Sequence, residues 1–282
     1  AGPGIALSFF LVAVVCALAG LCYAELASMI PVAGSAYTYA YATIGEFVAW
    51  IIGWDLILGY AVSNMASAVG FSAYVHSLLL SLGIHLPETL MQPVFANGML
   101  TGAYFNLPGF LIIMVMTVIL VIGIRESAGA NNLMVVVKIT AILVFVIAAG
   151  RYIDVENWSP FMPNGWQGVL TGGAIVFFTY IGFDSVSTAS EEARNPQRDI
   201  PFAIIASLIV CATLYVMVAL VLTGIQHWPT LRNAAPVANA LNALGLESVQ
   251  RWVTIGALTG MVSSMLVYQF GQARIWFSMS RD

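Results

Sequence analysis

Long apolar runs, separated by short stretches rich in Pro, Gly and polar residues, dominate the sequence. A helix needs about 20 apolar residues to cross the hydrocarbon core of a bilayer, and seven runs approach or exceed that length. The sustained alternation of apolar and polar residues that is typical of a membrane β-barrel does not occur. The pattern predicts helical spans over residues 5–23, 47–80, 107–124, 133–149, 168–189, 202–225 and 249–277.

The composition favours a membrane protein over a soluble one. The chain has 282 residues, of which 60% are hydrophobic and 8% are charged, whereas an average globular protein is about 25% charged. So few charges cannot cover a water-facing surface of this size. With a net charge of −4 and no basic stripe, the composition excludes a soluble enzyme, a nucleic-acid-binding protein and a disordered tail. The predicted fold class is an all-α membrane protein.

The start of the chain and the charges in its loops indicate how it lies in the membrane. Ala1-Gly2-Pro3-Gly4 enters the first apolar run without a Met or a basic segment, so we expect an interior piece of a longer chain and no signal peptide. Lys and Arg favour cytoplasmic loops. An outside N-terminus and a cytoplasmic C-terminus place five arginines inside and three outside: Arg125, Arg194, Arg198, Arg274 and Arg281 against Arg151, Arg232 and Arg251.

Lys138, the only lysine in the chain, lies within the fourth predicted span. A lysine at the centre of a membrane helix costs about 2.5–3.5 kcal/mol on insertion, so its side chain should face the protein interior. One interpretation is a lysine that reaches the cytoplasmic surface or forms a structural pair. The other is a lysine that gains and loses a proton during a working cycle, because burial destabilises its charged form.

Gly182 and Asp184 lie in the fifth predicted span, among aromatic residues. A glycine in this setting indicates a helix break, and non-helical backbone at membrane depth occurs only where it is buried in protein or lines a cavity. The alternative is an ordinary packing glycine, with Asp184 bonded to a neighbouring helix. The residues alone leave both interpretations open.

Other polar residues give weaker indications. Glu191 and Glu192 oppose the dipole at the end of the fifth span, so they either meet an arginine or lie in a solvated turn. Asp55, in the second span, is expected to be structural. The three His and three Cys are too scattered to bind a metal or form disulfides. Without a recognisable catalytic motif, neither an enzymatic activity nor a cofactor is expected.

Five segments carry a recognisable pattern. They are Cys22-Tyr-Ala-Glu-Leu-Ala-Ser, Pro31-Val-Ala-Gly-Ser-Ala-Tyr-Thr-Tyr, Gly45-Glu-Phe-Val-Ala-Trp-Ile-Ile-Gly-Trp-Asp-Leu-Ile-Leu, Phe178-Thr-Tyr-Ile-Gly-Phe-Asp and Glu191-Glu-Ala-Arg-Asn-Pro-Gln-Arg-Asp-Ile-Pro. In this order, and over nearly the whole chain, the sequence resembles the amino acid–polyamine–organocation (APC) superfamily of transporters. It is most similar to the branch of cationic amino acid transporters.

The resemblance implies a fold of twelve or more helices, the first ten of which form two inverted five-helix repeats. It aligns this chain with helices two to eight. Residues 1–282 would then form one incomplete transmembrane domain of about seven helices, without the broken first helix and the helices after the eighth. The fifth predicted span corresponds to the broken sixth helix of the family, with its interruption near Tyr180 to Gly182.

The resemblance also implies secondary active transport of amino acids by alternating access, in the plasma membrane. Exposed backbone at this break and at the break of the missing first helix would bind the α-amino and α-carboxylate groups of the substrate. By position, Phe178, Thr179, Tyr180 and Ile181 would line this site, with Phe178 as an aromatic cover, and Asp184 would face the substrate's side chain. The implied partners are an amino acid, a proton and the lipid bilayer, and no nucleic acid.

Two further positions follow from the resemblance. Lys138 matches a lysine that takes the place of a sodium ion in sodium-coupled relatives, which implies proton coupling, and Ser263 would lie close to it. Cationic members read Trp-Asp-Leu-Ile-Leu-Glu-Tyr in the third helix, where the Glu helps hold a basic side chain, but here Gly59 replaces that Glu. Losing this carboxylate costs a basic substrate about 2–5 kcal/mol if nothing replaces it. The sequence therefore leaves open whether the substrate is cationic or neutral.

Span count alone also fits a seven-helix receptor or a channel. A retinal-type receptor needs a lysine in its last span, whereas Lys138 lies in the fourth. A channel needs a ring of like charges or a carbonyl filter, and the sequence has no such pattern. The sequence favours the transporter.

Overall fold

The computed structural model describes residues 1–282 apart from positions 31, 33, 97, 98, 123, 189–192, 234 and 282, and apart from the side chains at 81, 88, 96, 124–128 and 130. The α-helices are α1 (Ile5–Met29), α2 (Ala36–Thr43), α3 (Glu46–Ser81), α4 (Leu107–Ile122), α5 (Ile124–Ala149), α6 (Gly165–Val176), α7 (Ser185–Thr188), α8 (Pro196–Ile225), α9 (Pro236–Ala243) and α10 (Glu247–Arg281). Short 3-10 helices are η1 (Gly2–Gly4), η2 (Glu88–Leu90), η3 (Gly150–Tyr152), η4 (Val155–Trp158), η5 (Phe177–Tyr180) and η7 (Trp228–Leu231). Strands β1 (Phe95–Ala96) and β2 (Met99–Leu100) pair antiparallel, with Phe95 opposite Leu100.

Most of the predicted spans are present as helices long enough to cross a membrane. By length and composition, six segments of the described chain qualify: Gly2–Met29, Glu46–Leu80, Asn131–Tyr152, Gly165–Thr188, Pro196–Ile225 and Glu247–Arg281. The predicted third span is α4, which is apolar but has only 16 residues. At 1.5 Å per residue it is about 24 Å long, shorter than the ~30 Å hydrocarbon core. The prediction of an all-α membrane protein is confirmed, with six full-length segments and one shorter helix.

The chain divides into two compact units. Unit 1 comprises Ala1–Ser63, Pro160–Ala219 and Val267–Asp282, and unit 2 comprises Asn64–Ser159 and Leu220–Leu266. Three of the four boundaries along the chain fall inside α3, α8 and α10, and the fourth falls between Ser159 and Pro160, outside any helix. Each unit therefore contains parts of these three long helices.

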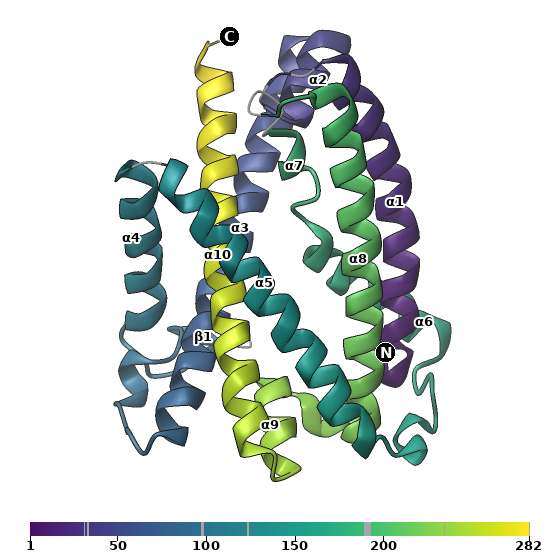
Figure 1. Cartoon of the computed structure of the whole chain (residues 1–282), viewed down its shortest axis with the longest axis vertical. Helices are drawn as coiled ribbons and strands as arrows, with labels where there is room; N and C mark the ends of the chain where they lie inside the picture. The colour runs from purple at the N-terminus through teal and green to yellow at the C-terminus, as the bar shows by residue number, and fades with distance from the viewer. Residues whose placement is uncertain are drawn as a thin grey trace. The chain divides into compact units, whose positions relative to one another are not determined.

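In unit 1, α1 runs beside α6 and α8 (Figure 1). Small residues allow the close approach, because a Cβ at Gly172 would lie 2.9 Å from the Ser8 hydroxyl oxygen. A Cβ at Gly20 would lie 2.6 Å from Leu208 Cδ1. The Ser8 hydroxyl also donates a 2.7 Å hydrogen bond to the carbonyl of Val169. Such close packing and interhelical hydrogen bonds hold membrane helices together, and here they fix α6 just before its helix ends.

In unit 2, α5 packs against α10 at two glycines four residues apart. A Cβ at Gly256 would overlap the Cβ of Ala141, and one at Gly260 would lie 3.3 Å from the Cβ of Lys138. Glycines at this spacing share one helix face and let the two backbones approach closely. On another side of α10, Met265 and Leu266 join an apolar cluster with residues of α3 and α4.

Three short elements lie in stretches that the apolar pattern marks only as loops. These are α2, the hairpin β1–β2 and α9. Helix α9 begins with Pro236, whose fixed backbone angle suits the first position of a helix. Its Ala238, Ala240 and Leu241 are buried. Elements of eight residues or fewer contain too few repeats for periodicity to reveal them.

We predict that Gly256→Ala destabilises the protein. The added methyl group would overlap Ala141, so α5 and α10 must separate, and overpacking of this kind costs about 1–3 kcal/mol. Gly129→Ala is the matched control, because a Cβ at Gly129 of α5 meets no atom within 4 Å. Thermal unfolding of the purified protein in detergent measures both changes. An unfolding temperature for Gly256→Ala equal to that of Gly129→Ala would contradict the prediction.

Candidate functional site

The fifth predicted span is a broken helix, as Figure 1 shows between α6 and α7. Helix α6 ends at Val176, a 3-10 turn covers Phe177–Tyr180, and a non-helical turn over 181–184 precedes Ser185–Thr188. Gly182 has φ +119°, a left-handed conformation that a side chain would strain. The predicted interruption at Tyr180 to Gly182 is confirmed, and the regular α-helix ends even earlier than predicted.

Tyrosine hydroxyls from other elements of unit 1 bond to the carbonyls at the break. Tyr268 of α10 donates to the carbonyl of Ile181 at 3.0 Å, and Tyr215 of α8 donates to that of Thr179 at 3.0 Å. A carbonyl group inside a membrane must have a donor, and these hydroxyls replace the missing helical N–H groups. Each carbonyl oxygen has two lone pairs, so each can accept a second donor from a ligand.

Asp184 holds the turn together. Its Oδ1 accepts a hydrogen bond from the Gly182 N–H at 3.0 Å, and its Oδ2 accepts one from the Tyr60 hydroxyl of α3 at 2.6 Å. Its carbonyl accepts from the hydroxyl of Ser187 at 2.6 Å. Only 7% of Asp184 is exposed. The side chain therefore closes the left-handed turn at Gly182 and ties it to α3.

The structure brings the residues assigned to the break into one neighbourhood of unit 1. Phe178 and Ile181 are half-buried, and Thr179 is exposed with its hydroxyl bonded to the carbonyl of Val176 at 2.7 Å. Tyr180 is buried, and its hydroxyl donates to the carbonyl of Phe9 at 2.9 Å. Its ring meets the ring of Tyr215 edge-on, with centroids 5.1 Å apart. Tyr180 thus fixes the break against α1 and α8.

Gly59 directly precedes Tyr60 in α3, at the edge of the buried face of this helix. A Cβ built at Gly59 meets no atom within 4 Å. The position therefore has room for a longer side chain, one residue away from the tyrosine that bonds to Asp184.

Lys138 and Ser263 both lie in unit 2, on α5 and α10. The aliphatic stem of Lys138 lies along α10, because a Cβ at Gly260 would be 3.4 Å from its Cδ. Ser263, one turn further along α10, is 2% exposed and donates to Asn131 Oδ1 of α5 at 2.6 Å. The stem of Lys138 and the hydroxyl of Ser263 thus share the α5–α10 contact, and Asn131 is a hydrogen-bond partner of Ser263 that the sequence did not indicate.

The remaining predicted groups contribute less. Glu191 and Glu192 lie outside the described residues, as does the side chain of Arg125. The guanidinium of Arg274 lies over the ring of Phe270, 4.9 Å from its centroid. Asp55 is exposed. Among the described residues, His, Cys, Asp and Glu form no group of three or more that could hold a metal ion.

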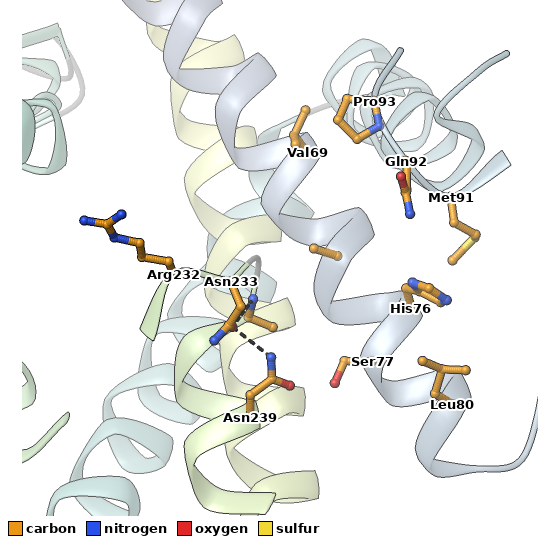
Figure 2. A pocket seen from close by; sticks show the side chains of 12 residues that line it. Val69, His76, Ser77, Leu80, Met91, Gln92, Pro93, Arg232, Asn233 and Asn239 are labelled. Carbon is orange, nitrogen blue, oxygen red and sulfur yellow. Dashed lines mark hydrogen bonds between the residues drawn. The ribbon is translucent and has the colours of Figure 1, made fainter. Parts of the chain in front are cut away.

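Unit 2 contains a separate cavity of about 1050 Å³. Figure 2 shows its lining from α3, from the segment around Gln92 and from the start of α9. Asn233 Oδ1 accepts from the amide of Asn239 at 2.8 Å and from the Ala235 N–H at 3.1 Å. This pair of side chains therefore braces the start of α9. This cavity could not be predicted from the sequence, because its lining comes from three segments that are far apart along the chain.

Comparison with protein families and with characterised proteins identifies the family. A family model described as amino acid permease matches residues 1–282. The methylthioribose transporter of Bacillus subtilis is 46% identical over 282 residues, which are all of this chain and 60% of that protein. The branched-chain amino acid permease BcaP of the same organism is 47% identical over 285 residues and is covered to 61%. Cationic amino acid transporter 9, chloroplastic, of Arabidopsis thaliana is 38% identical and is covered to 50%.

The chain therefore spans half to about six tenths of the length of these relatives. Their names are those of transporters and a permease, which agrees with the expectation that the chain is not an enzyme. The resemblance to the APC superfamily, deduced from the sequence motifs, is confirmed by a match over the whole chain. The chain belongs to the amino acid permease family and is an integral membrane protein.

Proposed function

We propose that the chain is part of a secondary active transporter for amino acids that works by alternating access in the plasma membrane. The observation that carries this proposal is the interruption of a membrane-spanning helix at Phe177–Tyr180 and Gly182. Irregular backbone at membrane depth is typical of transporter binding sites, where free lone pairs meet polar groups of the substrate. The carbonyls of Thr179 and Ile181 each keep one lone pair beside their tyrosine donor and are suited to an α-ammonium group.

The substrate is a neutral amino acid rather than a basic one. Gly59 brings no carboxylate to the site, and hydrogen bonds from Tyr60 and Gly182 hold the carboxylate of Asp184 against the turn and share its negative charge. The names of two relatives at 46% and 47% identity mention methylthioribose and branched-chain amino acids, ligands without a basic side chain. Medium-sized apolar amino acids such as leucine fit this chemistry best.

Transport is coupled to protons through Lys138. Its stem lies along α10 at Gly260, which places a single lysine inside the membrane-spanning part of α5. A lysine amine can bind and release a proton, so this side chain supplies the group that carries the proton during the cycle. Ser263 lies one turn away, and its oxygen retains acceptor capacity beside its bond to Asn131.

Uptake by the purified full-length protein in liposomes tests the proposal. Labelled leucine should accumulate when the outside is made acidic and should leak out again when a protonophore is added. Uptake that follows the amino acid gradient but does not respond to the pH gradient would contradict proton coupling and leave the proposal of amino acid transport intact. Failure to transport any amino acid would contradict the proposed function, and membrane fractionation of the source cells tests the location.

We predict that Lys138→Ala abolishes proton-driven accumulation of substrate while substrate binding changes little. Alanine cannot carry a proton, whereas the substrate-binding backbone at the break is unchanged by this substitution. The measurement is accumulation of labelled leucine under an imposed pH gradient, beside equilibrium binding in detergent. Thr140→Ala, an exposed position on the same helix, is the control and should still accumulate substrate. Accumulation by Lys138→Ala against a leucine gradient would assign the proton to another group.

We predict that Gly59→Glu shifts the preference of the site toward basic amino acids. The open space at Gly59 admits the side chain, and a carboxylate there should favour lysine and arginine by about 1–3 kcal/mol. Competition of unlabelled leucine, lysine and arginine against labelled substrate measures the change. Gly59→Gln, which has the same size without the charge, should leave the preference as it is. A strong preference of the unmodified protein for arginine over leucine would refute the assignment of a neutral substrate.

A further inference from the structure

Asp184 is a carboxylate in a membrane-spanning segment, and two uncharged groups donate hydrogen bonds to its side chain. One is the Gly182 N–H at 3.0 Å and the other is the Tyr60 hydroxyl at 2.6 Å. With 7% of Asp184 exposed, water can reach little of this group. The two hydrogen bonds therefore provide much of the stabilisation that solvent gives a carboxylate elsewhere.

The position of the Tyr60 hydroxyl is fixed by the packing of its ring. Tyr60 is 1% exposed and lies in an apolar cluster with Ile57 and Ile275. A Cβ at Gly271 of α10 would lie 3.0 Å from the ring, and the ring of Tyr268, three residues before Gly271 on α10, lies near it with centroids 6.0 Å apart. Because the ring cannot swing away, the hydroxyl stays directed at the carboxylate. Tyr60 is thus a rigid donor.

We propose that Tyr60 determines the substrate class by holding the Asp184 carboxylate as the cap of the helix break, so that the carboxylate does not serve as counter-ion for a basic substrate. This inference rests on the proposed function, because it concerns the same site. Tyr60 acts through Asp184 and is a positioning residue. An acidic residue at the break is then compatible with a neutral substrate.

The hydrogen bond from Tyr60 reduces what the Asp184 carboxylate gains from a cation. While Tyr60 donates to Oδ2, a substrate ammonium or guanidinium must share or displace a short hydrogen bond to a charged acceptor, which is among the stronger ones in proteins. Without the hydroxyl, Oδ2 loses its donor in a place that water hardly reaches. A basic side chain then offers the carboxylate a charged donor, whereas a leucine side chain offers none. Removing the hydroxyl should therefore favour basic substrates selectively.

Tyr60→Phe in the full-length protein tests the inference. The readout is the ratio of the inhibition constants of unlabelled leucine and lysine against labelled leucine, which does not depend on the amount of folded protein. We expect the ratio to shift toward lysine by about tenfold, the equivalent of a difference of about 1.4 kcal/mol. Tyr74→Phe, at another buried tyrosine of α3, is the matched control and should leave the ratio unchanged.

Repeating the substitution in an Asp184→Asn background shows whether Tyr60 acts through Asp184. Asparagine keeps an acceptor oxygen without the charge, so Tyr60→Phe should then change the ratio by less than about twofold. An unchanged ratio for Tyr60→Phe alone would assign Tyr60 a purely structural role and overturn the inference. An equal shift in both backgrounds would overturn it too, because the effect would not pass through the carboxylate. Failure of the unmodified protein to transport any amino acid would instead refute the proposed function.

Discussion

Backbone polar groups inside a bilayer must find partners within the protein, and this constraint governs the region around the helix break. At the break the helical N–H donors to Thr179 and Ile181 are missing, and tyrosine hydroxyls from α8 and α10 replace them. The carboxylate of Asp184 supplies the complementary acceptor for the Gly182 N–H. An interruption that would be costly in lipid is thereby stable, and its carbonyls keep lone pairs for a ligand.

The same constraint explains why small residues lie near the break and near Lys138. Lipid offers little hydrophobic driving force for helix association, so close packing has to hold the helices together. Gly172 and Ser8 bring α6 against α1, and Gly256 and Gly260 bring α5 against α10. These contacts fix α6 before its break and lay the stem of Lys138 along its neighbour. Each unit thus uses small residues to position one polar feature.

Local features of the sequence predicted much of the fold. The spans follow from apolar length, and the break follows from Gly182, because only glycine readily adopts its left-handed backbone. Helix α5 begins well before the predicted span at 133, since helical hydrogen bonds continue through polar residues outside the apolar run. Helix α2, the hairpin and α9 escaped prediction because tertiary contacts rather than periodicity stabilise such short elements.

The tyrosine donors could not be predicted from their own surroundings. Tyr60, Tyr215 and Tyr268 lie in apolar helices far apart in the sequence, and only the fold shows that their hydroxyls reach the break. A tyrosine inside an apolar span is a usable signal, since its hydroxyl needs a partner when buried. Such a tyrosine indicates that its hydroxyl has a hydrogen-bond partner, but it does not identify that partner. Their assignment to the break therefore depends on the tertiary structure.

The acidic residue at the break shows why residue type alone is a poor guide to substrate charge. A carboxylate attracts a basic ligand less strongly when donors of the protein already share its negative charge and fix its orientation. Around Asp184, the left-handed turn at Gly182 takes one oxygen and the packed ring of Tyr60 directs a donor at the other. The charge thus stabilises the geometry of the backbone at the break. An aspartate at this position is consistent with a neutral substrate, and the hydrogen bonds to its oxygens explain why.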